Sequence, residues 1–407
     1  MSIRIKIGRN AKEIDDALWV RHEVFVIEDG KFGGKPLLNS RLMDRFDSFP
    51  NVFNVIAYEG AEPIATIRLV KESECGVPAE ELFDFSSFRA EAANDLRDRN
   101  TERGDMGATQ RPVFGNAGML AIRGPWRRRR DVIRAMFRMA AAVCKANGAT
   151  HVVVAVNHET AGMYRRLGFT ALSEKIWIEE IENHIVPLAA QVETFLEWAL
   201  GKISDAPLTA FEDSFEREVL RAGEVLFQEG DAGTDAYIVE SGAIRISRRN
   251  EDGQDLVLTD LPPGGLFGEL ALIDNHPRSA TATATVDTEL IKLDRHSFLR
   301  DLRENPERAQ ELFQIFSGRI RRMDELAMML AFAPDDQRLS FALEVAKQRA
   351  EVDRKDPTIT FFRGGPEEFA RIAAVEEQTA SNFLAQLAEE GELEYSDKRI
   401  KFVASAG

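Results

Sequence analysis

The hydrophobic pattern of this chain changes character near residue 205. Before that point, strand-like runs alternate with helical runs, which is typical of an α/β domain. After it, short apolar runs recur about every ten residues with turn residues between them, as in a small antiparallel barrel or jelly roll. The stretch between the two patterns mixes Gly, Pro, Ser and Asp, a composition that indicates a linker. A single small fold is therefore excluded.

Length, cysteines and charge narrow the class of protein. The 407 residues allow about two to three domains at roughly 150 residues each. Cys75 and Cys144 lie far apart without metal-ligand spacing, so the sequence predicts no disulfide framework, no metal site and a reducing, cytoplasmic location. No run of about 18 apolar residues predicts a membrane span. The net charge of −16 opposes general affinity for nucleic acid.

The periodicities divide the chain into four predicted units: an α/β domain over residues 1–203, an all-β barrel over 204–304, a long helix over 305–332 and a small domain with two helices and a terminal hairpin over 333–407. The long helix carries one apolar seam at spacings of three or four, formed by Leu312, Phe316, Ile320, Met323, Leu326 and Leu330. Such a seam predicts a homodimer through this helix, and packing of the helix onto its own barrel is the alternative.

The most specific string is "FGELALIDNHPRSATATA", Phe267–Ala284. It combines a glycine turn, an acidic residue and an arginine nine positions later. Backbone amides together with a bidentate guanidinium suit a phosphate diester, and a carboxylate suits a ribose hydroxyl. The residues themselves therefore predict a site for a nucleotide phosphate.

This string resembles the phosphate-binding cassette of the cyclic-nucleotide-binding domains in cyclic-AMP-dependent kinase and the bacterial catabolite activator family. The resemblance implies that Glu269 binds the ribose 2′-OH and Arg278 the cyclic phosphate. It also implies backbone contacts at Gly268, Leu270 and Ala271 and a hydroxyl contact from Ser279. Cyclic AMP is preferred over cyclic GMP, although Ser279 also suits guanine and Arg319, Arg321 and Arg322 give no clear base code. A barrel that has lost its ligand is the alternative.

A second string, "NHETAGMYRRLGF", follows an apolar strand. Asn157 can cap a helix, Tyr164 lies two turns further along it, and Gly168 ends it. The spacing is similar to the last conserved block of the Gcn5-related N-acetyltransferase superfamily. That resemblance implies that Tyr164 lies near the thioester sulfur of an acyl donor and protonates the leaving thiolate, with Asn157 close to the donor.

The same superfamily binds a donor phosphate at the turn before its preceding helix, which here is "AIRGPWRRRRDVIRAMF". The usual glycines are replaced by Arg130 and Val132. Four arginines at a helix N-terminus nevertheless predict an anion site for a pantetheine phosphate or an acidic acyl carrier protein, formed by Arg127, Arg128, Arg129 and Arg130. A solvated helix face is the alternative.

The N-terminal third resembles acyl-homoserine-lactone synthases and long-chain N-acyl amino acid synthases, on the strength of Arg21, Phe25, Asp44, Asp47 and Arg68. Those enzymes move a fatty acyl group from acyl carrier protein or CoA to an amine. By this resemblance Arg21, Phe25 or Arg68 contacts the acceptor, and Asp44 or Asp47 takes its ammonium proton; turn capping is the alternative for the two aspartates. Asn116 and Met119 replace the usual Glu and Arg near the amine.

The last segment resembles the DNA-binding winged helix of the catabolite activator family. Between Pro366 and Tyr395, however, eight glutamates face one base, Arg371, and this charge argues against DNA binding. We therefore expect a cyclic-nucleotide-regulated N-acyltransferase, active as a homodimer and using acyl-CoA or acyl carrier protein without a metal. The alternatives are a cyclic-nucleotide-responsive transcription regulator and a catalytically inactive acyl-donor sensor.

Overall fold

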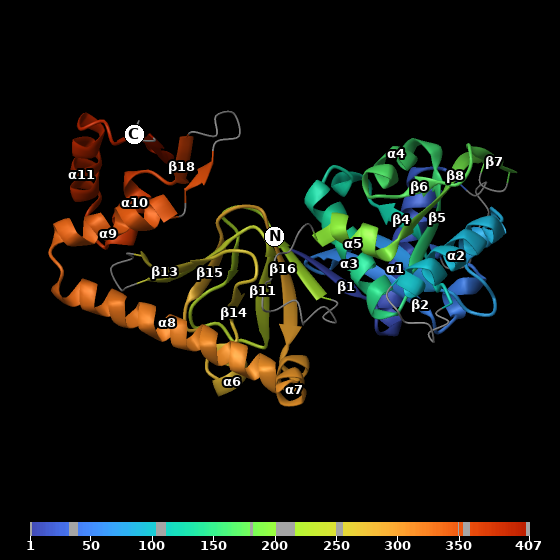
Figure 1. Cartoon of the computed structure of the whole chain (residues 1–407), viewed down its shortest axis with the longest axis horizontal. Coiled ribbons are helices and arrows are strands. Elements are labelled where there is room, and N and C mark those ends of the chain that lie inside the picture. The colour runs from blue at the N-terminus through green and yellow to red at the C-terminus, as the bar shows by residue number, and fades with distance from the viewer. Residues whose placement is uncertain are drawn as a thin grey trace.

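The computed structural model describes residues 2–31, 40–102, 111–179, 182–200, 216–249, 255–348, 350–352 and 359–403. The boundary expected at residues 203 and 204 lies outside this described part. Figure 1 shows three bodies in a row: an N-terminal α/β body, a barrel in the middle and a C-terminal body, with one long helix running from the barrel to the last body.

The N-terminal body is built on a mixed sheet in the order β1-β2-β3-β4-β5-β8-β6, with β7 also paired to β8. The segments "NVFNVIAYEG" and "PIATIRLVK" form the antiparallel pair β2–β3. The strands are β1 (Ile3–Ile7), β2 (Val52–Glu59), β3 (Glu62–Lys71), β4 (Phe114–Ile122), β5 (His151–Asn157), β6 (Thr170–Ala171), β7 (Ile176–Ile178) and β8 (Asn183–Gln191).

Helices cover this sheet, and α3 supplies most of the buried helical surface. Its alanines favour the helix, and its apolar residues recur on one face, from Val132 through Met136 and Ala140 to Val143. That face packs into the core with Ile5. The helices are α1 (Ala11–Arg21), α2 (Ser86–Glu102), α3 (Arg130–Ala146), α4 (His158–Arg166) and α5 (Val192–Leu200), with short turns at His22–Glu28, Arg45–Ser48, Pro78–Glu81 and Gly124–Trp126.

The barrel consists of two facing sheets, β14-β11-β16-β9 and β10-β15-β12-β13. The expected all-β unit is therefore present. Its strands are β9 (Glu216–Leu220), β10 (Val225–Phe227), β11 (Asp235–Ser241), β12 (Ile244–Arg249), β13 (Asp255–Leu261), β14 (Leu266–Phe267), β15 (Thr281–Ala284) and β16 (Thr288–Asp294), and its helices are α6 (Leu270–Asp274), α7 (Arg295–Glu304) and α8 (Pro306–Phe332).

The barrel and the N-terminal body share a sheet. β9 pairs antiparallel with β1, with Lys6 opposite Glu216 and Arg4 opposite Glu218. In the described residues, the two sheets thereby join into one sheet of 12 strands. The two bodies are therefore joined by strand pairing between β1 and β9.

The long helix α8 divides its predicted seam between two environments. Leu312 is buried against Phe298, and Phe316 packs against the same cluster, so this half of the helix lies on its own barrel. Further along, Ile320 and Met323 are 59% and 61% exposed. The side chains of Leu326 and Leu330 lie outside the described residues. The structure thus supports packing onto the barrel for the first half and leaves the second half open to a partner.

The C-terminal body contains three helices in its described part, α9 (Asp335–Gln348), α10 (Pro366–Ala373) and α11 (Glu377–Glu389). The sequence predicted the last two. Ala370, Leu384 and Leu387 are buried in the core of this body, and Val375 packs beside them. A small sheet closes the body in the order β17-β18-β20-β19, formed by β17 (Glu351–Val352), β18 (Ile359–Arg363), β19 (Leu393–Ser396) and β20 (Arg399–Val403).

The searches for a membrane span and a metal site cover the described ranges alone. There, no helix is both long and apolar enough to cross a membrane. No group of three or more His, Cys, Asp or Glu side chains is arranged there to hold a metal ion. Cys75 is exposed and Cys144 is buried, and both are free.

Candidate functional site

The N-terminal sheet opens between β4 and β5. These parallel strands pair only from Phe114 to Asn116, although both continue beyond that point. Asn116 lies where they part, and its Nδ2 donates to the backbone oxygen of Val153 at 2.7 Å. Met119 has a left-handed backbone with φ of 51°, which interrupts regular pairing of β4. Beyond Asn116, the edges of β4 and β5 that face each other are therefore not paired with one another.

The turn at residues 123–129, which we call the donor turn, precedes α3 and forms ion pairs with acidic side chains. Arg127 Nη2 lies 2.7 Å from Glu28 Oε2 and 3.0 Å from Asp29 Oδ1. Arg129 Nη2 lies 2.6 Å from Asp131 Oδ2. Arg127 and Arg129 are thus engaged by carboxylates, and the anion site expected from the four arginines stays a prediction.

Arg128 and Arg130 remain exposed at this turn. Asp131 occupies the first turn of α3, where its pKa is held below the ordinary value because Arg129 and the Val132 amide outweigh the effect of burial. A carboxylate at a helix N-terminus takes the position that a phosphate favours. At this turn, the exposed side chains of Arg128 and Arg130 therefore face solvent, and the amides at the helix N-terminus are shared with the carboxylate of Asp131.

Tyr164 is buried on α4, in the core of the N-terminal body. Its ring makes edge contacts with Phe137 at 5.5 Å and Phe169 at 5.6 Å between centroids. Burial raises the pKa of its hydroxyl above the usual value. Asn157 is the N-cap residue of α4, as the sequence predicts, but its side chain makes no capping hydrogen bond there. Thr160 Oγ1 instead donates to the Asn157 backbone oxygen at 2.9 Å.

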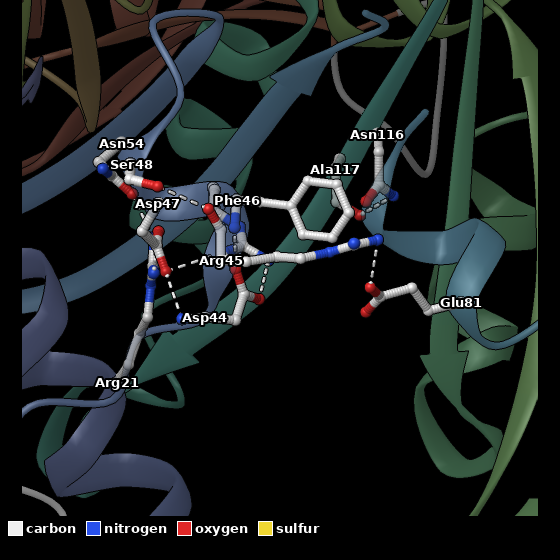
Figure 2. A network of polar contacts seen from close by, with 11 residues as sticks. Arg21, Asp44, Arg45, Phe46, Asp47, Ser48, Asn54, Glu81, Asn116 and Ala117 are labelled. Atoms are coloured by element: carbon white, nitrogen blue, oxygen red, sulfur yellow. Dashed lines mark hydrogen bonds and ion pairs between the residues drawn. The ribbon is translucent and has the colours of Figure 1, made fainter. Parts of the chain in front are cut away.

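A buried ion cluster lies between α1, β2, β3 and the turn Arg45–Ser48 (Figure 2). Arg68 donates to both oxygens of Asp44 at 2.7 Å and lies 2.9 Å from Asp47. Arg21 donates to Asp47 at 2.7 Å and also to Asn54. Two arginines and two aspartates therefore neutralise one another inside the domain.

These contacts change the roles expected of the cluster. Burial alone would raise the pKa of Asp47, but the guanidinium groups of Arg21 and Arg68 outweigh it and hold that pKa below its ordinary value. A carboxylate of this kind is a poor base. Arg21 is fully buried, and it is engaged as a partner of Asp47 rather than open to an acceptor. Asp44, with its side chain 33% exposed, is the member that faces solvent.

The alternative of turn capping is confirmed for both aspartates. Asp44 Oδ1 accepts from the Phe46 amide at 2.9 Å, and Asp47 Oδ2 accepts from the Asp44 amide at 3.0 Å. Figure 2 shows Arg45 extending the other way, across the Phe46 ring toward Glu81. Phe25 is half-buried and packs beside Val20 and Ala121. Its predicted contact with the acceptor stays a prediction.

The nucleotide motif forms a compact cradle in the barrel. Gly268 has φ of 74°, and a Cβ there would lie 2.6 Å from Arg278 Nη1, so glycine is required. Arg278 donates to the Gly268 oxygen at 2.7 Å and stacks 4.1 Å from the Phe227 ring centroid. Ala271 is buried, whereas Leu270 and Ser279 are exposed.

Two buried polar atoms of this cradle have no hydrogen-bond partner, Glu269 Oε2 and Arg278 Nε. Burial raises the pKa of Glu269, an effect that Arg319 only partly offsets, and burial lowers the pKa of Arg278. Such orphaned groups carry a cost that a hydroxyl and a phosphate would remove. The residues present therefore fit a cyclic nucleotide.

Arg319 of α8 contacts the cradle. It pairs with Glu269 Oε1 and donates to the Leu266 backbone oxygen. The sequence indicated Arg319 only as one of three candidate base contacts. Its pairing with the carboxylate expected to hold the ribose depends on the path of α8, which no local motif encodes.

Comparison with known proteins assigns both halves of the chain. The model of the N-acyl amino acid synthase FeeM family matches residues 18–191, and that of the cyclic nucleotide-binding domain matches residues 217–305. The cyclic AMP receptor protein of Thermus thermophilus is 35% identical over 178 residues, which are 44% of this chain and 79% of that protein.

Other relatives match the same part. A CRP-like cAMP-activated global transcriptional regulator of Mycobacterium tuberculosis is 28% identical over 44% of this chain and 80% of its own length. The crystal structure of the Thermus thermophilus catabolite activator protein is 30% identical, with a TM-score of 0.29, and covers 51% of this chain and 94% of that one. The chain thus carries an N-acyl amino acid synthase domain of the FeeM family followed by a cyclic-nucleotide-binding domain, and through this second part it belongs to the cyclic AMP receptor protein family.

Proposed function

We propose that this protein transfers a fatty acyl group from a carrier thioester to the amine of an amino acid, under the control of a cyclic nucleotide. The observation that carries the proposal is the opening between β4 and β5 beside the N-terminus of α3, within the segment that matches the FeeM family. This opening lies in a chain that also contains an orphaned carboxylate and guanidinium in a nucleotide cradle.

The transfer itself needs little covalent help from the protein. The neutral amine attacks the thioester carbonyl, a C–N bond forms and the C–S bond breaks. The proton lost by the amine is balanced by the proton gained at sulfur. Backbone amides along the β4–β5 gap stabilise the developing oxyanion, and holding the two reactants side by side supplies the rest.

Tyr164 supports the leaving thiolate through a hydrogen bond. Its raised pKa lies above that of an ordinary thiol, near 8.5, so full proton transfer from the hydroxyl to sulfur would be uphill. A hydroxyl that stays protonated still donates to sulfur as negative charge develops there. Its part is therefore stabilisation of charge, with the final proton coming from the amine or from water.

Arg128 and Arg130 select the donor by charge. They are exposed, whereas Asp131 and Arg129 close the helix N-terminus to a second phosphate. An acyl carrier protein offers a single phosphate and an acidic surface, and acyl-CoA offers a pyrophosphate that needs more amide donors. The geometry favours the carrier protein as donor.

The C-terminal part acts as a sensor and a dimerisation element. Cyclic AMP is the proposed effector, on the basis of the Thermus relative at 35% identity. The exposed side chains of Ile320 and Met323, three residues apart on one face of α8, form an apolar surface that a second copy of the chain would cover. Sedimentation of the full-length protein checks this, and a monomer at micromolar concentration would contradict it.

A transcription regulator remains the second candidate, favoured by one observation. Similarity to the cyclic AMP receptor proteins runs over 178 residues, well beyond the barrel model that ends at residue 305. The C-terminal body would then be a winged helix with α11 toward DNA. The exposed residues of α11 and its cap include Glu376, Glu377 and Glu389, which repel phosphate. Binding of random duplex DNA at low salt with a steep salt dependence would favour this candidate.

Free-thiol release tests the proposed function. Acyl carrier protein and acyl-CoA donors are combined with pooled amino acids, without nucleotide and with cyclic AMP or cyclic GMP. We expect turnover that depends on the acyl donor and changes with one nucleotide. Tight nucleotide binding without any turnover would instead support the catalytically inactive sensor.

A further inference from the structure

A second buried ion cluster lies where the barrel meets the acyltransferase domain. Arg138 of α3 donates to Glu289 Oε2 of β16 at 2.8 Å and to Ser241 Oγ of β11 at 3.2 Å. Arg217 of β9 lies 2.8 Å from Glu240 Oε2 and 3.4 Å from Glu289 Oε1. We call Arg138, Arg217, Glu240 and Glu289 the junction cluster.

The junction cluster ties α3 to three barrel strands. Arg217 also lies 3.2 Å from the sulfur of Met139, the residue after Arg138 on α3. The side chains of Arg217, Glu240 and Glu289 are at most 6% exposed. Buried charges of this kind keep their arrangement only while each has its partners, so a shift of one strand changes the energy of all four.

On the barrel side, the cluster lies a short distance from the nucleotide cradle. Tyr237 of β11 stacks on Phe267, with ring centroids 5.5 Å apart, and its centroid lies 5.8 Å from Cζ of Arg278. Glu240 lies on the same strand, three positions after Tyr237. A phosphate that draws Arg278 away from these rings therefore acts directly on the strand that carries Glu240.

On the enzyme side, the cluster lies on the helix that begins at the donor turn. Arg138 follows Arg130 by eight residues, about 12 Å along α3 at 1.5 Å per residue. The apolar face between them is buried in the core, so α3 moves as one body. A displacement of α3 at Arg138 therefore also moves Arg130 and the adjoining Arg128 at the donor turn.

We propose that the junction cluster is the contact through which nucleotide occupancy of the barrel alters the donor turn of the acyltransferase. This inference rests on the proposed function, since it assigns a route to the regulation proposed there. Arg138 is in this scheme a positioning residue that acts through α3. Because coupling between two sites is reciprocal, a bound donor changes nucleotide affinity by the same factor.

Amide hydrogen exchange of the full-length protein, with and without cyclic AMP, tests the proposal. In the wild-type protein we expect cyclic AMP to change exchange in residues 130–146 as well as in the barrel. Arg138→Met is expected to reduce the change in residues 130–146 at least twofold, with the affinity for cyclic AMP kept within threefold. Glu289→Met removes both carboxyl oxygens of the same contact while it keeps a side chain of similar length, and it is expected to act in the same direction.

Arg300→Met is the matched control, because Arg300 is exposed on α7 and outside the cluster; it is expected to behave as wild type. A substitution that merely loosened α3 would raise exchange equally with and without nucleotide, whereas the proposal predicts loss of the difference. If both cluster variants kept the full effect of cyclic AMP on exchange in α3, the inference would be overturned. The same holds if exchange in wild-type α3 does not change when cyclic AMP binds. Failure of the wild-type protein to bind nucleotide would overturn the proposed function as well.

Discussion

The nucleotide cradle and the ion cluster of Arg21, Arg68, Asp44 and Asp47 differ in how their buried carboxylates are paired. In the cradle, Glu269 Oε2 and Arg278 Nε are buried without a hydrogen-bond partner. In the ion cluster, the carboxylates of Asp44 and Asp47 are fully engaged by Arg21 and Arg68. In these two sites, the carboxylate that points to a ligand therefore keeps one oxygen without a partner, whereas both carboxylates that hold the fold have their oxygens engaged. Arg21 Nε of the ion cluster is also buried without a hydrogen-bond partner, so the difference concerns the carboxylates and not the guanidinium groups.

The two sites also differ in how their family motifs are distributed along the sequence. The cradle motif lies in one continuous string, Phe267–Ala284, so its geometry is local. The acyltransferase motif is spread over α1, a turn and β3, and the fold brings its members together as mutual partners. Substitutions in the first should lower ligand affinity, and substitutions in the second should lower stability.

The largest effect is expected for Asp47→Asn. The change leaves Arg21 and Arg68 buried with one carboxylate between them, and breaking a buried ion pair costs about 3 kcal/mol. Urea unfolding followed by circular dichroism measures the loss. The control is Asp15→Asn, whose exposed pair with Arg41 is worth less than about 1 kcal/mol. Equal effects of the two changes would contradict a structural role for the cluster.

Arg278→Ala should act on affinity instead. Removal of two charge-assisted hydrogen bonds to a phosphate is expected to weaken cyclic AMP binding about a hundredfold, while the unfolding free energy stays near that of wild type. Isothermal titration calorimetry measures the dissociation constant. Arg300→Ala, an exposed change on the neighbouring α7, should leave it unaltered. Unchanged affinity in Arg278→Ala would refute the cradle as the nucleotide site.

The same contrast explains how much the sequence could predict. Glu269, Arg278 and Gly268 were found from one string because their partners are near in sequence. The ion pairs of Arg127 with Glu28 and of Arg129 with Asp131 were missed. A run of arginines shows its charge but not Glu28, which a segment 99 residues away brings beside Arg127. Asp131 is only two residues from Arg129, so this pair was visible in the string and was overlooked.

The shared sheet could not be predicted at all from local patterns. β1 and β9 are separated by more than two hundred residues, and alternation in each strand specifies a buried face without naming its neighbour. Arg138, Arg217 and Glu289 look like surface charges in sequence for the same reason. Their burial follows from the pairing of two bodies that the composition of the linker had indicated to be separate.

The strand pair that joins the two regions should give the protein a pH dependence. Glu218 of β9 is buried, and burial raises its pKa to about 6 against the opposing effects of Lys292 and Arg4. Since the unfolded value is 4.5, the folded state holds the proton more tightly. The stabilising contribution is complete below about pH 4.5 and is lost as the pH rises through 6, by about 2 kcal/mol in total.

Glu218→Gln should remove this slope. Urea unfolding of both proteins at several pH values from 4.5 to 7 is expected to show the wild type losing stability relative to the variant. Glu304→Gln, at the exposed end of α7, is the matched control and should follow the wild type. Parallel curves for wild type and Glu218→Gln would show that this carboxyl is not protonated in the folded state.

Tyr164→Phe should have the smallest effect and speaks to the chemistry itself. The variant keeps the ring contacts with Phe137 and Phe169 and removes only the hydroxyl. Loss of one hydrogen bond to a developing thiolate is expected to lower kcat about tenfold, with KM for the donor unchanged. A role as obligatory proton donor would produce a far larger loss, which a better leaving thiol would rescue, whereas a purely structural role would leave kcat at the wild-type value. Because burial already holds the hydroxyl proton in place, we expect the modest loss, nearly constant from pH 6 to 9.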